Sequence, residues 1–312
     1  MTVELVDVLT DDDLVHTGAF LEAARPVSEV AGIDVALMMH GNSANFYHPF
    51  YRYFAERLAE LGCPSLRANN RGHDVVHRPV GPRNQVSALE AYHEQPAQYF
   101  GTAYEELDDC RRDWRAWISY LWDRGYRSIL LWGHSRGAVK TAYYMGTEND
   151  PRIRACIVAS PPQFSYSRWM RSPQADLFAA HLAEARSWVD KGQPDALIRV
   201  KVPMEYMSGA ATYLDKYGPE EKYDVMRHLP NIRCPVLAIS GTEEVALRFG
   251  FDGLPEGFQR VRQTKPDLTP LSVPGGDHLY TGQQDLVLAR ILDWLRDLPE
   301  AAAPQAAARL DG

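Results

Sequence analysis

The strongest chemical signal in the chain is a serine between two glycines, in the motif Gly-His-Ser-Arg-Gly at residues 133–137. A short apolar run at residues 129–132 precedes the motif, and a stretch rich in Ala, Val and Tyr follows it. This order predicts a strand, a sharp turn and a helix, with Ser135 at the apex of the turn. Glycines two residues before and two after the serine let the turn close, because a Cβ atom there would crowd the neighbouring backbone. The motif is therefore typical of a nucleophilic serine exposed above a sheet.

A serine nucleophile requires partners, because its hydroxyl is weakly reactive near neutral pH. It needs a general base within hydrogen-bonding reach and a carboxylate that orients the base. His278 is the candidate base, because it lies in a glycine-containing loop after the apolar residues 268–273. Another apolar run, residues 235–240, ends in Gly-Thr-Glu-Glu at residues 241–244, which offers candidate acids. The chain order is therefore serine, acid, histidine.

The elements that must position these residues alternate between strands and helices. The hydrophobic pattern predicts a leading hairpin at residues 3–8 and 14–20. It predicts further strands at residues 35–39, 64–68, 128–132, 155–159, 235–240 and 268–273, and helices at residues 49–61, 107–122, 139–145 and 286–295. Because several strands are apolar on both faces, we expect an α/β fold with a mostly parallel twisted sheet and helices on both faces.

The composition indicates one enzyme-sized globular unit. The chain has 312 residues, of which 45% are hydrophobic and 24% are charged, and this suits one α/β sheet with an inserted subdomain. A net charge of −8 disfavours nonspecific binding to nucleic acid or anionic membranes. The first 13 residues lack the pattern of a secretory signal, and no apolar run approaches the roughly 20 residues of a membrane helix. We expect a cytoplasmic protein without a membrane span that acts on a small molecule; the oligomeric state stays open.

The cysteines and histidines do not suggest a metal centre. No metal-binding spacing is present among the four cysteines, Cys63, Cys110, Cys156 and Cys234. The ten histidines contain no His-Glu-x-x-His pattern. We expect free, mostly buried thiols in a reducing compartment, no metal site and no other cofactor.

With these motifs in place, the sequence resembles the α/β-hydrolase superfamily, whose catalytic triad follows the same chain order. The resemblance covers roughly residues 34–295. The His-Gly-Asn-Ser sequence at residues 40–43 is similar to the family's oxyanion loop, and residues 70–74 are similar to its Arg-Gly-His turn. The resemblance implies an α/β-hydrolase fold with an inserted helical cap. Because serine occupies the elbow, the chain is most similar to the branch of esterases, lipases and small-substrate hydrolases.

The resemblance also implies which carboxylate orients His278. Family members usually have an aspartate at the end of a Gly-x-x-Asp turn. Glu244 occupies that position here, and Glu243 is the alternate. Some family members take the acid after the preceding strand, but here that strand ends in Ala-Ser-Pro-Pro at residues 159–162, without a carboxylate.

The oxyanion hole follows from the same resemblance, which implies the backbone amides of Asn42 and Arg136. Losing one such donor typically raises the barrier by about 3 kcal/mol. The positive end of the helix that begins at Arg136 would stabilise the same anion. The side chain of Arg136 is unusually large and charged for this position. It either recognises a polar group of the substrate, such as a carboxylate, or forms a salt bridge with a nearby protein carboxylate.

Two segments interrupt the alternation of strands and helices. Residues 73–104 are either a wall beside the active site or a peripheral excursion. The second segment lies between two core strands, where family members commonly place a cap. We therefore predict a core at residues 1–160 and 231–298, a cap at residues 161–230, and a disordered tail at residues 299–312.

Substrate contacts are expected from the oxyanion loop, the elbow and the cap. The expected residues are His40, Gly41, His134, Trp169 and Met207. Trp169 and Met207 belong to the predicted cap. They are part of a larger apolar set that either lines an acyl pocket or packs the cap onto the core, and its other members are Met170, Met204, Tyr206 and Tyr213.

These features predict a carboxylesterase-like serine hydrolase that cleaves an ester-type bond of a small molecule through an acyl-enzyme. Its triad would be Ser135, His278 and Glu244. The same triad would also serve an acyltransferase, a thioesterase or a lactonase. A lyase or a C–C bond hydrolase on this scaffold, and a ligand-binding receptor with an idle triad, are further alternatives, because fold alone does not decide function.

Overall fold

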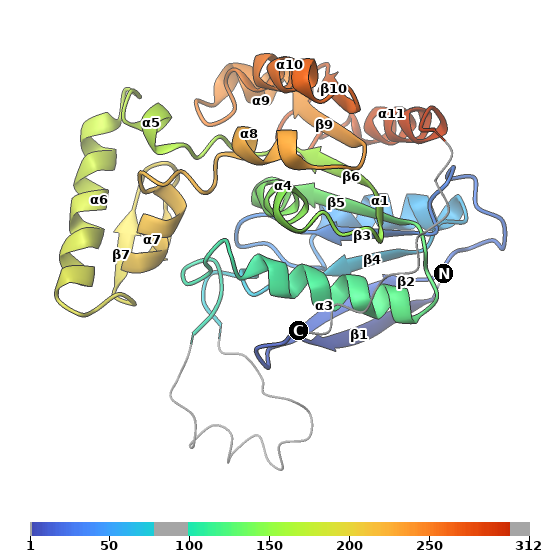
Figure 1. The fold of residues 1–312 in the computed structure, drawn as a ribbon, viewed down its shortest axis with the longest axis horizontal. Helices are drawn as coiled ribbons and strands as arrows, with labels where there is room; N and C mark the ends of the chain where they lie inside the picture. Colours follow the sequence, from blue (N-terminus) through green and yellow to red (C-terminus); the bar gives the residue numbers. More distant parts are fainter. Residues whose placement is uncertain (1, 78–98, 300–312) are drawn as a thin grey trace, which may run out of the picture.

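The structure is a computed structural model that describes residues 2–77 and 99–299 (Figure 1). Within these residues, eight strands form one sheet in the order β1-β2-β4-β3-β5-β6-β9-β10. The strands are β1 (Val3–Leu9), β2 (Val15–Leu21), β3 (Val35–Met39), β4 (Ser65–Ala68), β5 (Ile129–His134), β6 (Ile153–Ala159), β9 (Val236–Gly241) and β10 (Leu268–Val273). Strand β2 is antiparallel to β1 and β4, and the other pairs are parallel. The predicted leading hairpin and mostly parallel sheet are confirmed.

Helices cover both faces of this sheet, as the doubly apolar strands predict. One face is covered by α1 (Pro49–Glu60) and α11 (Gln284–Arg296). The other face is covered by α3 (Cys110–Asp123), α4 (Arg136–Glu148) and α10 (Leu254–Thr264). The central strands β3 and β5 are buried along their whole length. Residues at the carboxyl ends of these strands therefore start from a rigid, fully packed base.

Between β6 and β9 the chain leaves the sheet and forms the cap, at the left of Figure 1. The cap contains α5 (Tyr166–Trp169), α6 (Ala175–Asp190), β7 (Leu197–Val200), β8 (Tyr206–Gly209) and α7 (Ala210–Tyr217). The short helices α8 (Val225–His228) and η1 (Leu229–Asn231) then pack against α4 and return the chain to the sheet. The inserted helical cap is present, and the antiparallel hairpin of β7 and β8 is an addition that the sequence pattern does not predict. The domain boundaries stay predictions.

Two predicted segments lie partly or largely outside the described residues. The tail at residues 299–312 is described only at Pro299, and the segment at residues 73–104 is described only at its two ends. These ends meet, because His77 and Phe100 exchange two backbone hydrogen bonds of 2.8 Å. None of the helices within residues 2–77 and 99–299 is long and apolar enough to cross a membrane.

Candidate active site

Ser135 lies at the sharp turn between β5 and α4. Its backbone has φ 57° and ψ −127°, a conformation that L-residues rarely adopt. The Ser135 N–H donates a hydrogen bond of 2.8 Å to the carbonyl oxygen of Ala159, which fixes the turn to strand β6. A Cβ atom at Gly133 would collide with the carbonyl oxygen of Gly137, and one at Gly137 would press on the backbone of His40. Both glycines are therefore required for the strand-turn-helix arrangement that the motif predicts.

His278 lies in the loop after β10, and its ring contacts a buried carboxylate. The Nδ1 atom of His278 is 3.0 Å from Oε2 of Glu244, which lies in the short helix α9 (Thr242–Leu247). Glu244 is 2% exposed, whereas the neighbouring Glu243 is exposed. The second oxygen of Glu244, Oε1, is buried and accepts no hydrogen bond from any described residue. Of the two candidate acids, the structure brings Glu244 to His278.

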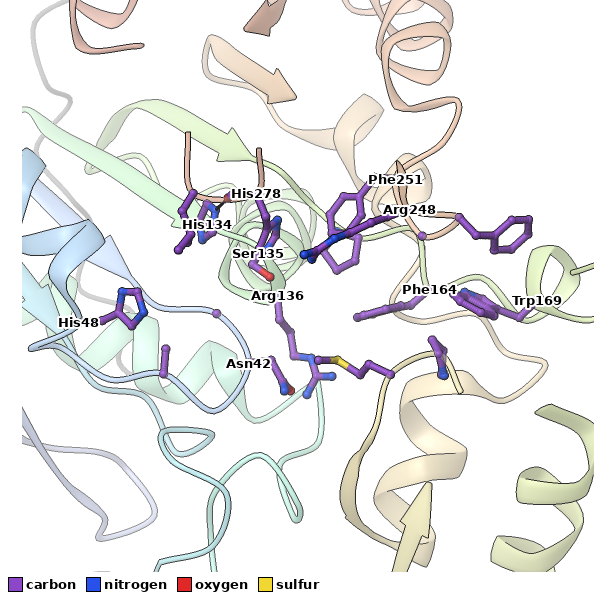
Figure 2. Close-up of a pocket in the computed structure, with 18 of the residues that line it drawn as sticks. Asn42, His48, His134, Ser135, Arg136, Phe164, Trp169, Arg248, Phe251 and His278 are labelled. Carbon is purple, nitrogen blue, oxygen red and sulfur yellow. Dashed lines mark hydrogen bonds between the residues drawn. The ribbon is translucent and has the colours of Figure 1, made fainter. Parts of the chain in front are cut away.

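Ser135 and His278 line the same pocket, which has a volume of about 470 Å³ (Figure 2). No hydrogen bond joins the Ser135 hydroxyl to the His278 ring, although both residues are described. Such contacts are often long in the absence of substrate and shorten when substrate binds. The pocket thus contains a candidate nucleophile and a candidate base, with the base oriented by a carboxylate.

Asn42 and Arg136, whose backbone amides are the predicted oxyanion donors, both line this pocket. The backbone N–H groups of Asn42 and Arg136 donate to no other group in the described part of the chain. Gly41 lets the loop approach the nucleophile, because a Cβ atom there would lie 2.8 Å from the Cβ atom of Ser135. Thr102 donates a hydrogen bond of 3.1 Å to the side-chain carbonyl of Asn42 and so holds the loop from behind. Two unused amides therefore lie beside the candidate nucleophile.

A chain of hydrogen bonds connects the oxyanion loop with the loop of His278. Gly41 N–H donates to the hydroxyl of Tyr51 at 3.0 Å, and this hydroxyl lies 3.4 Å from Nδ1 of His134. Nε2 of His134 lies 2.7 Å from the carbonyl oxygen of His278. Burial, reinforced by the neighbouring His278, holds the pKa of His134 well below its usual value. A neutral ring carries one N–H, which must point at the carbonyl, and Nδ1 then accepts from Tyr51. His134 thereby positions the candidate base.

The side chain of Arg136 is fully buried and forms a salt bridge with Glu105. Its guanidinium lies 3.2 Å from the Glu105 carboxylate and 3.1 Å from the hydroxyl of Tyr217. Lys140 also contacts this carboxylate, and Nζ of Lys216 lies 3.4 Å from it. Burial alone would raise the pKa of Glu105, but these three basic side chains outweigh burial and hold the pKa well below its usual range. Of the two interpretations of Arg136, the structure shows the salt bridge.

The predicted substrate-binding residues fall into two groups. Gly41, His134 and Trp169 line the pocket. His40 does not, because its ring is buried behind the loop, where Nδ1 lies 2.9 Å from the Gly41 carbonyl oxygen. Burial lowers the pKa of His40 to about 3. Met207, an exposed residue of β8, is also absent from the lining.

Several lining residues were missed by sequence reasoning. They include His48, Phe164, Arg248, Phe249 and Phe251. Three of them lie in the irregular stretch between α9 and α10, where periodicity carries no information. The only available signal was the pair of phenylalanines that follows the candidate acid within seven residues.

Metal ligands are not clustered in the part of the chain that the structure describes. In residues 2–77 and 99–299, no three His, Cys, Asp or Glu side chains are arranged to hold a metal ion. The four cysteines carry free thiols. Burial raises the pKa of the Cys63 thiol to about 12, which disfavours the thiolate that metals bind.

Comparison with known proteins gives matches to one family model and to solved structures. The model of the alpha/beta hydrolase family matches residues 36–291. Est1E from Butyrivibrio proteoclasticus with bound ferulic acid is 16% identical, with a TM-score of 0.60 over 93% of this chain and 98% of that chain. The alpha/beta hydrolase GrgF from Penicillium sp. sh18 is 13% identical, with a TM-score of 0.65 over 95% and 98%. The Pyrococcus furiosus esterase Pf2001 is 16% identical, with a TM-score of 0.58 over 95% and 90%. No curated protein matches the sequence. At such identities these likenesses concern the fold.

Proposed function

The chain belongs to the alpha/beta hydrolase family, and from this premise we propose that it is a serine hydrolase that cleaves a carboxylic ester bond of a small molecule. The observation that carries the proposal is the pocket shared by Ser135 and His278, with the Nδ1 atom of His278 3.0 Å from Glu244. The esterase from Pyrococcus furiosus among the structural neighbours is consistent with this chemistry. Ester cleavage is preferred to the other acyl transfers because it is the simplest reaction that these groups perform.

The first half of the proposed reaction forms an acyl-enzyme. Glu244 accepts the Nδ1 proton of His278 in a hydrogen bond, which leaves Nε2 free to take a proton. His278 removes the proton of the Ser135 hydroxyl while the serine oxygen attacks the ester carbonyl. The backbone N–H groups of Asn42 and Arg136 bind the oxygen that becomes negative. The tetrahedral intermediate then expels the alcohol, which takes its proton from His278.

The second half releases the acid and restores the enzyme. A water molecule donates a proton to His278 and attacks the carbonyl carbon bound to Ser135. The same two amides stabilise the second tetrahedral intermediate. His278 returns the proton to the serine oxygen as the acid leaves. The positive end of α4, which begins at Arg136, favours the oxyanion in both halves.

The test combines covalent labelling with ester hydrolysis. A fluorophosphonate should add once to the intact protein, at Ser135, as measured by mass spectrometry. Hydrolysis of p-nitrophenyl esters from acetate to octanoate should be measured in parallel. In Ser135→Ala, the label should be lost and kcat should fall by about 10⁴-fold or more. Ser187→Ala, on the exposed side of α6, is the control and should behave as wild type.

The neighbouring glutamates give a matched test of the acid. Glu244→Gln should lower kcat by about 10³–10⁴-fold, because the orienting charge beside His278 is lost. Glu243→Gln removes an exposed carboxylate one residue away and should cost less than about twofold. Unchanged ester turnover in Ser135→Ala would refute the nucleophile, and equal losses in the two glutamine variants would refute the assigned acid.

A further inference from the structure

The backbone of Arg248 continues directly from the short helix α9, which carries the candidate acid Glu244. It directly follows α9, one helical turn after Glu244, and its N–H donates a hydrogen bond of 3.2 Å to the Glu244 carbonyl oxygen. The carbonyl oxygen of Arg248 accepts a hydrogen bond of 2.9 Å from the N–H of Phe251. Its backbone is therefore fixed relative to His278, and its side chain lines the pocket and extends into it beside Ser135 in Figure 2.

The guanidinium of Arg248 differs from that of its neighbour Arg168 in having no hydrogen-bond or ion-pair partner among residues 2–77 and 99–299. Arg168, from cap helix α5, donates a hydrogen bond of 2.7 Å to the Phe249 carbonyl oxygen and lies 3.4 Å from the Asp252 carboxylate. Arg248 has neither a side-chain hydrogen bond nor an ion pair with any residue of the described ranges. A guanidinium left unpaired at a pocket wall is available to a ligand, and its planar fork matches a carboxylate.

The charged side chains that line the pocket also favour a negatively charged ligand. Two arginines line it, Arg136 and Arg248, and no acidic side chain from the described residues does. Arg136 is committed to Glu105, but its Nε atom is buried and has no hydrogen-bond partner among these residues. The chain as a whole carries a net charge of −8. The pocket is thus a positively charged site in an acidic protein, and this favours an anionic ligand.

The remaining walls of the pocket are mostly apolar. They include Phe164, Trp169, Met204, Phe249 and Phe251. Such walls accept the apolar body of a ligand, while the Arg248 side chain stays exposed to solvent at the pocket wall. A carboxylate needs one planar pair of donors, which a single guanidinium supplies.

We propose that the pocket selects substrates that carry a carboxylate on an apolar body, and that Arg248 binds this carboxylate. This specificity rests on the ester hydrolysis proposed above, because the substrate then presents an ester carbonyl to Ser135 and a carboxylate to Arg248. Arg248 is in this view a specificity-determining residue with no part in proton transfer.

Binding is tested first, in a form that does not depend on turnover. Calorimetry on Ser135→Ala at pH 7 compares 3-phenylpropionate with 3-phenylpropionamide, which has a similar shape and no charge. The carboxylate should bind about tenfold more tightly, as expected for one charge-assisted contact in a partly open site. Adding Arg248→Gln should abolish this preference. Adding Arg262→Gln, an exposed arginine on α10 outside the pocket, should leave it unchanged. Equal binding of the two ligands, or a preference that survives Arg248→Gln, overturns the proposal.

Kinetics then separate the specificity from the reaction. The substrates are p-nitrophenyl hexanoate and the p-nitrophenyl monoester of adipic acid, which differ only in a terminal methyl or carboxylate. The ratio of their kcat/KM values, adipate to hexanoate, should fall about tenfold in Arg248→Gln and partly recover in Arg248→Lys. If neither ester is hydrolysed but the binding preference depends on Arg248, the proposed function fails and the anion site stands. If both esters are hydrolysed with a ratio that Arg248→Gln does not change, the anion site fails and the proposed function stands.

Discussion

Two clusters of largely buried ionisable side chains differ in how their charges are balanced. The first, the elbow cluster, consists of Glu105, Arg136, Lys140 and Lys216. The second, the turn cluster, consists of Asp12, His16, Arg71 and Asp113. Three basic side chains share one carboxylate in the elbow cluster. In the turn cluster two carboxylates share one arginine and one histidine, and Arg112 and Asp109 add one further ion pair each, to Asp12 and Arg71 respectively.

The turn cluster belongs to the scaffold, because its members pair with one another away from the pocket. The Arg71 guanidinium lies 2.9 Å from both Asp12 and Asp113, and Nε2 of His16 lies 2.9 Å from the Asp113 carboxylate. The backbone N–H of Arg71 also donates to Asp113 at 3.0 Å, so the cluster fixes the Arg-Gly-His turn after β4. None of these four residues lines the pocket.

The elbow cluster, by contrast, reaches the candidate active site. Arg136 directly follows Ser135 and lines the pocket, and Lys140 lies one helical turn later on α4. A buried charge without an opposite partner lowers the stability of the folded protein. Proteins usually tolerate such a loss of stability at functional sites. Of the four side chains of the elbow cluster, Arg136 brings positive charge to the wall of the pocket. The comparison leads us to the hypothesis that a balanced cluster holds a turn, whereas an unbalanced one favours negative charge in the adjacent site.

The largest effect is expected from Glu105→Gln, which leaves three buried basic groups without their carboxylate. The free energy of unfolding should fall by about 3–5 kcal/mol, because removing one partner of a buried pair leaves uncompensated charge. The variant that stays folded should also lose about tenfold in kcat, since Arg136 loses the partner that fixes it behind Ser135. Urea denaturation and ester hydrolysis on the folded fraction measure the two effects. If the variant loses stability but keeps the wild-type kcat, the elbow cluster stabilises the fold only, like the turn cluster.

A smaller effect, confined to stability, is expected from Asp113→Asn in the turn cluster. Arg71 keeps Asp12 as a partner, so the free energy of unfolding should fall by only about 2 kcal/mol. The kcat of the folded variant should stay within twofold of wild type, because no residue of this cluster lines the pocket. A tenfold loss of kcat in this variant would remove the distinction between the clusters.

The pH dependence of stability gives the same variant a second readout. Burial alone would raise the pKa of Asp113, but the neighbouring His16 and Arg71 outweigh burial and hold the pKa well below its usual range. A carboxyl with a lowered folded-state pKa adds stability that is present above its unfolded pKa, about 3.9, and is lost as pH falls further toward the folded value. Urea midpoints measured between pH 7 and pH 2.5 should therefore fall less steeply below pH 4 in Asp113→Asn than in wild type.

The two clusters also show which parts of the molecule the sequence could predict. The sheet, its helices and the grouping of Ser135, Glu244 and His278 could be predicted, because each of these residues follows an apolar strand. Parallel strands end at one edge of a sheet, where sites gather. The roles of these residues stay predictions.

The walls of the pocket and the clusters could not be predicted in this way. Arg248 and Phe251 come from an irregular stretch without a periodic pattern. In the elbow cluster only Arg136 and Lys140 share a helix, while Glu105 and Lys216 come from a loop and from cap helix α7. The cap hairpin was missed because β7 and β8 have four residues each, and an arginine in β7 and a serine and a glycine in β8 interrupt the apolar pattern.

The smallest effect, and the sharpest test of excess charge, is expected from Lys216→Met. Burial, and then the charge of Arg136, hold the pKa of Lys216 well below its usual value. Between the folded pKa and the unfolded value of about 10.4, the unfolded chain binds more protons, so wild-type stability should rise with pH. Lys216→Met removes this penalty and should be about 1 kcal/mol more stable at pH 7, with a difference that shrinks toward pH 9.

Urea denaturation of wild type, Lys216→Met and the exposed cap control Lys201→Met at pH 7, 8 and 9 measures this difference. Lys201→Met should show no pH-dependent gain. If Lys216→Met is instead destabilised at every pH, the third basic group is needed to hold Glu105, and the elbow cluster is balanced like the turn cluster. A gain that shrinks with pH would mean that Lys216 releases its proton when the chain folds. The elbow cluster would then reduce its excess of basic groups by holding one of them neutral rather than by pairing it with a second carboxylate.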